Sequence, residues 1–189
     1  MKILKRIKGL ILSPDEEWAV IEKEQKSIVE LYRDYILYLA LIPPFANFLG
    51  GYFFGFGHGG RIAQLSLAAG LIRALLQYAL SLPLLYLVAF VLSSIAPHFE
   101  GKSSDTRALT LAAYSYTPAW IVALFAFAPG LRWLDVLGFY GVYIFYHGLP
   151  RMLKCPKDHA DVFTLAALVL TIATAALHAW IVSMATPKF

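Results

Sequence analysis

Long apolar stretches alternate with short polar segments along most of this chain. A helix needs about 20 mostly apolar residues to cross a bilayer, where its backbone groups find no hydrogen-bond partner outside the helix. Five stretches approach this length, and the fourth of them is short. We therefore expect an all-α fold, a polytopic membrane helical bundle with five transmembrane helices, at residues 35–56, 71–96, 108–128, 133–147 and 162–184.

The first 34 residues follow a different pattern, which predicts a cytosolic amphipathic segment ahead of a transmembrane domain at residues 35–189. In MKILKRIKGLIL, apolar residues recur at helical spacing with basic residues between them, as in a helix that lies on an anionic membrane surface. This run is too brief for a cleaved signal peptide. In SPDEEW, Ser13 can cap a second helix that has Pro14 at its first position. We interpret the second helix as a solvated connector, with a protein-docking face as the alternative.

The composition agrees with a membrane protein. Of the 189 residues, 59% are hydrophobic and 15% are charged, and the mean hydropathy is +0.64. The single cysteine cannot form an intramolecular disulfide. The net charge of +4 does not predict nucleic acid as a partner, because in a membrane protein the placement of the basic residues matters more than their sum.

The basic residues gather on one side of the predicted spans. Cytosolic loops of membrane proteins carry an excess of Lys and Arg. If the N-terminus lies inside, twelve basic residues fall on the inner side, and the outer side holds Arg61, Arg73, Arg132 and Lys188. This bias predicts a cytoplasmic N-terminus and a C-terminus on the other side of the membrane.

Three of the predicted spans contain internal prolines. Pro43 and Pro44 lie in the first span, Pro83 in the second and Pro118 in the third. Proline cannot donate a backbone hydrogen bond, so it kinks a helix. We interpret these prolines as packing kinks, with the broken helices of a transporter as the alternative.

The fifth predicted span is rich in small residues. Ala167, Thr171 and Ala175 stand four residues apart, and such a face lets helices approach closely, either within the bundle or in a dimer. His178 in the same span is interpreted as a buried hydrogen-bond donor rather than a proton-handling group, because no relay of titratable groups accompanies it.

The segment YIFYHGLPRMLKCPKDHAD turns from apolar to polar within a few residues. Cys155 and His159 stand four residues apart and, with Met152 or His147, could offer soft ligands to Cu(I) or Zn. However, Pro156 interrupts a helix between them, and no second ligand pair completes a tetrahedral site. A nucleophilic cysteine would also lack an oxyanion hole. We therefore predict no metal site, no cofactor and no catalytic residue, so the chain is not expected to be an enzyme.

A structural interpretation explains more of this segment, as a tight inner hairpin between the fourth and fifth spans. Gly148 and Pro150 are expected to end the fourth span, and Asp158 to begin the next helix behind Pro156. The basic residues between them would meet anionic headgroups. The hairpin is a candidate interaction site, made of Gly148, Leu149, Pro150, Pro156, Asp158 and His159.

Two further patterns have competing interpretations. GFGHGGR satisfies G-x-G-x-x-G, but it follows a membrane span rather than a strand, so we interpret it as a flexible turn and not as a nucleotide site. Arg73 and Asp135 each lie just inside the outer end of a span. They are a candidate intramembrane polar pair, with snorkelling to the headgroups or a substrate-binding role as alternatives.

Several motifs occur in a fixed order: PDEEW ahead of the first span, then LIPPFANFLGG, APHFEG, AYSYTPAW and YGVYIFYHGLPRMLKCPKDHADVFT. Together they resemble the YIP family (Ypt-interacting-protein family), in its bacterial branch, over roughly residues 12–164. The resemblance implies a five-span helical protein of the bacterial inner membrane with a cytosolic N-terminus. Eukaryotic relatives are linked to vesicle traffic, Rab-type GTPases and membrane shaping, and they associate with one another.

Two functions compete. The first is a non-enzymatic integral membrane protein that acts through self-association, as a homo-oligomer, and through contacts with lipids or with another membrane or cytosolic protein. The second is a small transporter or channel for an ion, metal or metabolite. Its polar path through the kinked spans would be lined by Asn47, Gln77, Tyr114, Tyr116, Thr117 and Asp135.

Overall fold

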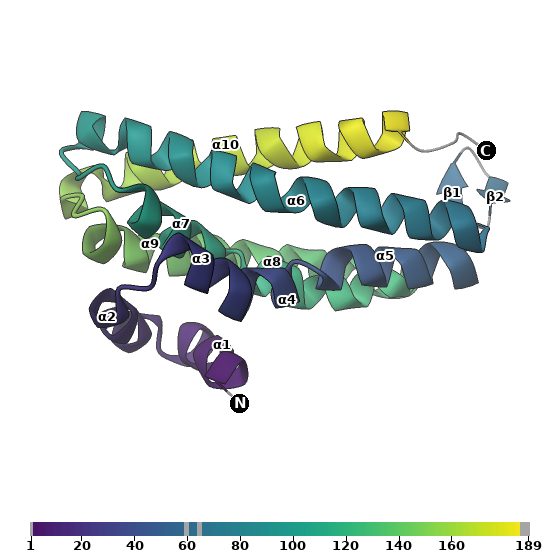
Figure 1. Ribbon diagram of the computed structural model, residues 1–189, viewed down its shortest axis with the longest axis horizontal. Helices are drawn as coiled ribbons and strands as arrows, with labels where there is room; N and C mark the ends of the chain where they lie inside the picture. The colour runs from purple at the N-terminus through teal and green to yellow at the C-terminus, as the bar shows by residue number, and fades with distance from the viewer. Residues whose placement is uncertain (1, 59–60, 64–65, 186–189) are drawn as a thin grey trace.

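The chain runs back and forth along one long axis in the computed structural model, which describes residues 2–58, 61–63 and 66–185 (Figure 1). The first pass is built from four helical pieces. They are α3 (Ile28–Leu31), the π-helical η1 (Tyr32–Ile36), α4 (Leu37–Leu39) and α5 (Ile42–Phe53). Ser27 and Glu30 form a capping box at its start. The helix is interrupted before Pro43 and Pro44, which confirms the kink predicted there.

A short hairpin leads into the second pass. Strands β1 (Phe56–His58) and β2 (Arg61–Ala63) pair antiparallel, with Phe56 opposite Ala63. Gly55 precedes them at a φ of 75°, which glycine adopts readily. The turn predicted at GFGHGGR is this hairpin, although Gly59 and Gly60 lie outside the described residues. Apart from these strands, the elements of the described chain are helical.

The second pass is a single helix, and the third is again divided. Helix α6 (Leu67–Ile95) contains Pro83 and ends in the 3₁₀ turn η2 (Ala96–Phe99). The third pass consists of α7 (Asp105–Ser115), α8 (Thr117–Val122) and the 3₁₀ helix η3 (Ala123–Phe127). The break between α7 and α8 lies at Tyr116, just before Pro118, because the proline cannot donate to the preceding turn.

The fourth pass is longer than the predicted span at residues 133–147. It begins as the 3₁₀ helix η4 (Pro129–Phe139) and continues as α9 (Tyr140–Met152). A 3₁₀ helix rises about 2 Å per residue and an α-helix about 1.5 Å, so the two pieces together extend for roughly 40 Å. The fifth pass is α10 (Lys157–Ala185).

The first half of the fourth pass explains why the sequence underestimates its length. It contains Arg132, Asp135 and two glycines, which lower its apolar character although it is helical throughout. Polarity alone sets the predicted boundary, whereas the 3₁₀ geometry of η4 covers more distance with each residue. A periodicity of three, which brings Arg132, Asp135 and Gly138 into one row, is the signal in the sequence for this geometry.

Helix α9 continues beyond the point where the fourth span was predicted to stop. The expectation that Gly148 and Pro150 end this helix is wrong, because both lie within it. Pro150 stands in the last turns, where its missing N–H removes one hydrogen bond without ending the helix. The helix ends at Met152, and Lys154 then adopts a left-handed conformation with a φ of 55°.

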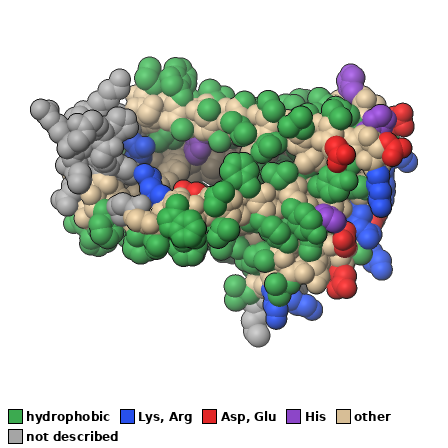
Figure 2. Space-filling model, turned by 180° about the vertical axis from the view of Figure 1, so that it is seen from behind, with side chains coloured by type: hydrophobic (Ala, Val, Ile, Leu, Met, Phe, Trp, Pro, Cys, Tyr) green, Lys and Arg blue, Asp and Glu red, His purple; other side chains and the backbone are tan. Residues whose placement is uncertain are grey.

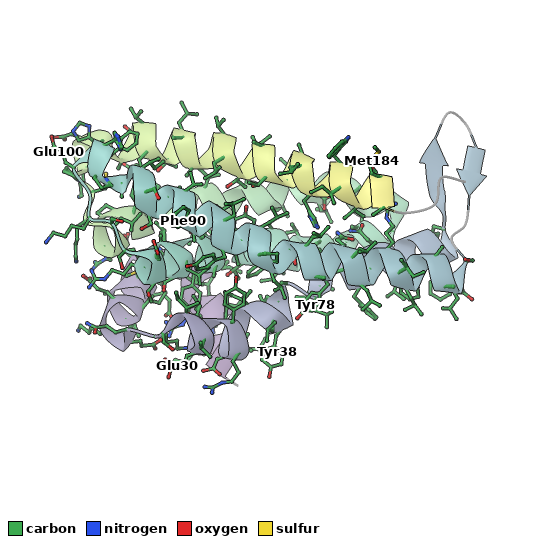
Figure 3. All side chains as sticks on the ribbon, turned by 45° about the horizontal axis from the view of Figure 1, so that its top comes forward. Glu30, Tyr38, Tyr78, Phe90, Glu100 and Met184 are labelled. Atoms are coloured by element: carbon green, nitrogen blue, oxygen red, sulfur yellow. The ribbon has the colours of Figure 1, made fainter. Side chains whose placement is uncertain are left out.

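Among the residues that the structure describes, four helical stretches are long and apolar enough to cross a membrane: Ile28–Phe53, Leu67–Phe99, Asp105–Phe127 and Lys157–Ala185. They correspond to the first, second, third and fifth predicted spans. Side chains project outward along α6 and α10, among them Phe90 and Met184 (Figure 3). Charged side chains gather at one end of the molecule, and hydrophobic ones cover most of the rest of the face shown in Figure 2.

Two helices precede the passes. Helices α1 (Lys2–Leu12) and α2 (Pro14–Glu24) lie on one side of the bundle, near the end where α9 finishes (Figure 1). Leu10, Trp18 and Ile21 from these helices belong to the same hydrophobic core as the bundle. The predicted boundary after residue 34 falls within η1, and the division into residues 1–34 and 35–189 stays a prediction.

Helices α7 and α9 cross in close contact. A Cβ atom added to Gly141 would collide with the carbonyl oxygen of Ser115. In contrast, a Cβ added to Gly130 of the same pass would meet nothing within 4 Å. Glycine at position 141 is therefore a packing requirement, since any side chain there would push the third and fourth passes apart.

Candidate interaction site

Trp18 fixes α2 to the bundle. Its side chain is fully buried, and its Nε1 donates a hydrogen bond to the carbonyl oxygen of Ile144 at 2.9 Å. The indole occupies the space that a side chain at position 148 would need. A Cβ added to Gly148 would collide with the indole and would come within 2.7 Å of a methyl carbon of Leu111. Gly148 of the predicted hairpin therefore leaves the space in which a tryptophan from the N-terminal segment packs.

Aromatic rings continue this contact into the bundle. Tyr114 packs edge-to-face against Trp18 and Tyr35, with ring centroids 6.1 and 4.7 Å away. The hydroxyls of Tyr35 and Thr117 lie 2.6 Å apart, so one donates to the other. Tyr35 lies in the π-helical η1, a type of turn that often occurs at functional sites. We call Trp18, Tyr35, Tyr114 and Gly148 the tryptophan cluster.

Arg6 covers the outer side of the tryptophan cluster. Its guanidinium lies 5.5 Å from the ring centroid of Tyr114 and forms ion pairs with Glu17 and Glu24. Burial alone would lower the pKa of Arg6, but Tyr114 and the two carboxylates outweigh it and raise that pKa. The sequence analysis placed Arg6 at the lipid headgroups. No pattern in the sequence indicates this role, because Tyr114, which the guanidinium faces, lies far away in the chain.

Polar contacts surround the junction between α2 and α9. His147 Nδ1 lies 2.8 Å from a carboxylate oxygen of Asp15. Glu22 forms an ion pair with Lys154 and lies 3.7 Å from Arg151. The hydrogen bond from Lys154, opposed by partial burial, lowers the pKa of the Glu22 carboxyl. The basic residues that were expected to meet headgroups thus also hold α2.

The loop after α9 is fastened to the loop after α6. The backbone N–H of Lys102 donates to the carbonyl oxygen of Leu153 at 2.6 Å. Phe99 and Phe163 pack edge-to-face with centroids 4.9 Å apart. A Cβ at Gly101 would lie 3.0 Å from the same Leu153 oxygen. The APHFEG motif and the inner hairpin therefore form one unit at the charged end of the bundle.

Cys155 is buried in this unit. Its thiol donates to the carbonyl oxygen of Phe99 at 3.3 Å, and burial together with Glu100 raises the pKa of the Cys155 thiol. A protonated, buried thiol is a poor nucleophile. His159 Nε2 lies 3.5 Å from Glu100, while His147 pairs with a different carboxylate. Within the described residues, no group of three His, Cys, Asp or Glu side chains could hold a metal ion.

The remaining residues of the predicted hairpin differ in exposure. Leu149 is fully buried, Pro150, Pro156 and His159 are half-buried, and Asp158 is exposed in the first turn of α10. The hairpin as an interaction site stays a prediction.

The predicted polar residues of the spans lie toward the other end. Arg73 is in α6 and Asp135 is in η4, and their pairing stays a prediction. His178 is half-buried, and its Nε2 lies 3.0 Å from the carbonyl oxygen of Gln77. Because a carbonyl can only accept, the histidine is the donor, as the sequence analysis expected.

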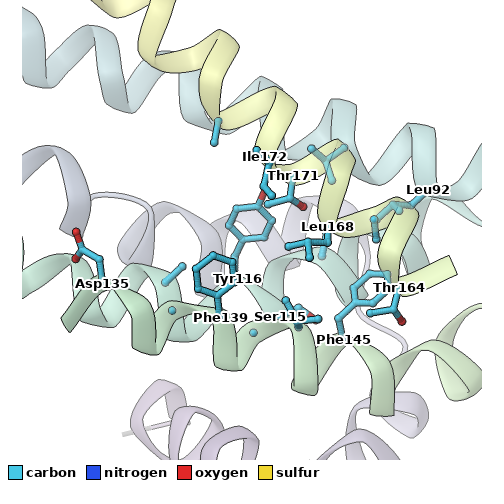
Figure 4. A pocket seen from close by; sticks show the side chains of 18 residues that line it. Leu92, Ser115, Tyr116, Asp135, Phe139, Phe145, Thr164, Leu168, Thr171 and Ile172 are labelled. Carbon is cyan, nitrogen blue, oxygen red and sulfur yellow. The ribbon is translucent and has the colours of Figure 1, made fainter. Parts of the chain in front are cut away.

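A cavity of about 260 Å³ lies between α6, α10 and the third and fourth passes (Figure 4). Of the side chains proposed for a polar path, Tyr116 and Asp135 line it. Tyr114 instead packs against Trp18 in the tryptophan cluster, and the Thr117 hydroxyl is hydrogen-bonded to that of Tyr35. Asn47 Nδ2 lies 3.5 Å from Gln77 Oε1. The polar path of the transporter hypothesis stays a prediction.

The comparisons with known proteins agree with the resemblance seen in the motifs. The Yip1 domain matches residues 8–179 of this chain. The chain therefore belongs to the Yip1 family. Inner membrane protein YohC of Escherichia coli strain K12, and the YohC of strain O6:H1, are each 31% identical over 170 residues, covering 87% of this chain and 87% of theirs. No solved structure matches the chain.

In this Yip1-family protein, the motifs that carry the resemblance lie in contact. Trp18 of PDEEW rests on Gly148 of the hairpin motif and on Tyr114 of AYSYTPAW. The hairpin motif in turn bonds to the residue after APHFEG, through Leu153 and Lys102. Segments separated by more than a hundred residues thus build one site at the charged end.

Replacing Gly148 with Ala is expected to lower the free energy of unfolding by about 1–3 kcal/mol, because the new methyl group collides with the indole of Trp18. Trp18→Ala should cost about 3–5 kcal/mol, since it empties a fully buried site. Equilibrium unfolding in mixed micelles measures both effects.

Trp180→Ala is the matched control, because the Trp180 side chain is 59% exposed and the substitution should change stability by less than about 0.5 kcal/mol. In the double variant W18A/G148A the space left by the indole accepts the new methyl group, so additive losses would contradict the assignment.

The ion pairs of Glu22 predict a pH-dependent contribution to stability. Its pKa is lowered from the ordinary 4.5, so its contribution is complete above that pH and is lost as the pH falls through the lowered value. Glu22→Gln should therefore reduce the unfolding free energy at pH 7 by about 0.2–1 kcal/mol, and the difference should vanish in acid or at high salt. Glu16→Gln, an exposed change on the same helix, is the control. A loss that persists at low pH would rule out the charge as its cause.

Proposed function

We propose that this protein is a non-enzymatic organiser of the bacterial inner membrane, which acts by holding α1 against the cytosolic leaflet. The observation that supports this role is the way α1 and α2 are fixed to the bundle. Trp18 is seated on Gly148, and Arg6 is held by two carboxylates. The hydroxyl of Tyr140 also donates to the carbonyl oxygen of Ile11 at 2.9 Å. Helix α1 is thus held rigidly beside the spans.

The surface of α1 suits the membrane interface. Leu4 and Leu12 are 72% and 67% exposed, although both are apolar. Lys5 and Lys8 are exposed between them and can meet anionic headgroups. An amphipathic helix in the interface inserts its apolar face about 5–10 Å, which adds area to one leaflet only. A helix that inserts while it is held by the bundle changes the shape or the packing of the surrounding leaflet.

The orientation and the number of spans belong to this proposal. The four apolar stretches would be joined by η4 and α9 as a fifth span, because the roughly 40 Å length of these two pieces exceeds the 30 Å of a hydrocarbon core. The loops at the charged end hold most basic residues, which supports a cytosolic N-terminus. The location in the inner membrane is inferred from the name of the Escherichia coli relative, inner membrane protein YohC.

The topology predicts different protease access to the two ends. In sealed inside-out vesicles, trypsin should remove an N-terminal tag and leave a C-terminal tag intact, and right-side-out vesicles should give the reverse pattern. Immunoblots against both tags measure the result. Cleavage of both tags from one side would rule out an odd number of spans.

Self-association would bring the α1 helices of several copies of the protein close together. The outward faces of α6 and α10 carry large apolar side chains, such as Leu75 and Leu165, which are 66% and 60% exposed and suit either lipid or a second copy of the chain. Energy transfer between labelled copies, measured as the lipid-to-protein ratio rises, tests for an oligomer. Transfer that only follows random dilution would leave the lipids as the partner of this surface.

The function is tested by the shape of reconstituted vesicles. Vesicles of anionic bacterial lipid should become smaller or tubular as the protein density rises, and the double variant L4S/L12S should lose most of this effect because its α1 no longer inserts. Electron cryomicroscopy gives the diameter distribution. Val20→Ser is the control, since Val20 is an exposed apolar residue of α2, and its vesicles should resemble those of the wild type. Equal diameters with and without the wild-type protein would refute the proposal.

A further inference from the structure

Two hydroxyl groups in the spans lack the hydrogen bond that their neighbours make. Ser and Thr in a helix can donate to a carbonyl three or four residues earlier. Ser94, Thr110 and Thr174 do so, each at 2.8 Å. The hydroxyls of Ser115 and Thr164 have no partner within the described residues, although these residues are only 7% and 9% exposed. An unpaired buried hydroxyl costs roughly 1–3 kcal/mol, so this exception needs a cause.

Both hydroxyls line the cavity between α10 and the third and fourth passes. Figure 4 shows Ser115 and Thr164 at the same end of it, with Asp135 far from both. Most of the other lining side chains are apolar, and they include Leu168, Phe145 and Val142. The cavity is therefore a mostly apolar space with the two hydroxyls toward one end, while Tyr116, Thr171 and Asp135 add polar groups further along it.

The length and the depth of the cavity correspond to one leaflet. On α10 its lining runs from Thr164 to Ala175, twelve residues that span about 16 Å, and half of a 30 Å hydrocarbon core is about 15 Å. Asp161 is the last charged residue of α10, and Thr164 follows it by about one turn. Thr164 thus lies where headgroups give way to hydrocarbon, and the cavity reaches from there toward the bilayer centre. Ser115 lies deeper, eight residues beyond Arg107, the last charged residue of α7.

The far part of the cavity is open to the side. Phe139 and Ile172 line it, and they are 59% and 54% exposed. A hydrocarbon chain can therefore enter from the surrounding bilayer without passing through water.

We propose that this cavity binds one acyl chain of a cytosolic-leaflet phospholipid, with its ester carbonyl accepting a hydrogen bond from Thr164. The ester lies at the boundary between headgroup and hydrocarbon, which is the depth of Thr164. The site goes beyond the proposed role of α1, because it involves other helices and fails independently.

A photoreactive lipid tests the location. Phosphatidylethanolamine with a diazirine midway along one acyl chain is incorporated with the protein into vesicles, irradiated, and the labelled peptides are mapped. Labelling should be several-fold stronger at the half-buried Leu168 than at Leu165 and Val169, which are each 60% exposed on the outward face of the same helix. Uniform labelling around α10 would overturn the proposal.

The double variant S115A/T164V tests the hydrogen bond. It should lower labelling of the cavity several-fold, because the hydrogen bond from Thr164 is lost. Thr110→Val is the control, since Thr110 is buried, donates to its own helix and does not line the cavity. Ala175→Phe, an exposed position at the far end, should reduce labelling by filling the cavity without disturbing the core. Unchanged labelling in both variants would overturn the proposal.

Competing lipids identify the group that is bound. An ester-linked phosphatidylethanolamine should compete with the probe several-fold better than its diether analogue, which lacks the carbonyl. The two should compete equally in the S115A/T164V variant. Equal competition in the wild type would show that the hydroxyls bind water only and would overturn the assignment. Stronger competition by a free fatty acid would overturn the choice of a phospholipid.

Discussion

The seating of Trp18 on Gly148 is the contact on which the arrangement of the charged end depends. An indole is the largest apolar group that α2 offers, and it can reach the bundle only where the facing helix has no side chain. Its N–H also needs a partner once it is buried, and the carbonyl of Ile144 supplies one. This one contact fixes both the distance and the direction of α2. The ion pairs around it then need to contribute only a modest stabilising free energy, as is usual for exposed ion pairs.

The interrupted helices follow from the same demand for close packing. The π turn of η1, the break before Pro118 and the 3₁₀ geometry of η4 each depart from a regular α-helix. In lipid such departures are tolerated where neighbouring groups pair with the freed backbone or pack against it. Here the irregular pieces place the hydroxyl of Tyr35 beside that of Thr117. They also bring Gly141 into contact with the carbonyl oxygen of Ser115. Regular helices, in contrast, form the outward-facing α6 and α10.

Much of this architecture could be predicted from the sequence, because lipid imposes a simple rule on length and polarity. The apolar runs located four of the stretches, and the prolines located the breaks before α5 and α8. The motifs gave the family. The roles of Gly148 and Arg6 could not be predicted, since each depends on a partner far away in the chain. A glycine near a helix end resembles a stop signal, and only the neighbouring indole reveals it as a contact surface.

Residues 114–117 separate the two sites and belong to both. Tyr114 points to Trp18 and Arg6, while Ser115 and Tyr116 line the cavity on the other side. Thr117 then returns to Tyr35. Because these four residues span the break between α7 and α8, neither set of side chains can move without shifting the backbone of the other. The position of the N-terminal helices and the shape of the cavity are therefore set by the same short segment, AYSYTPAW.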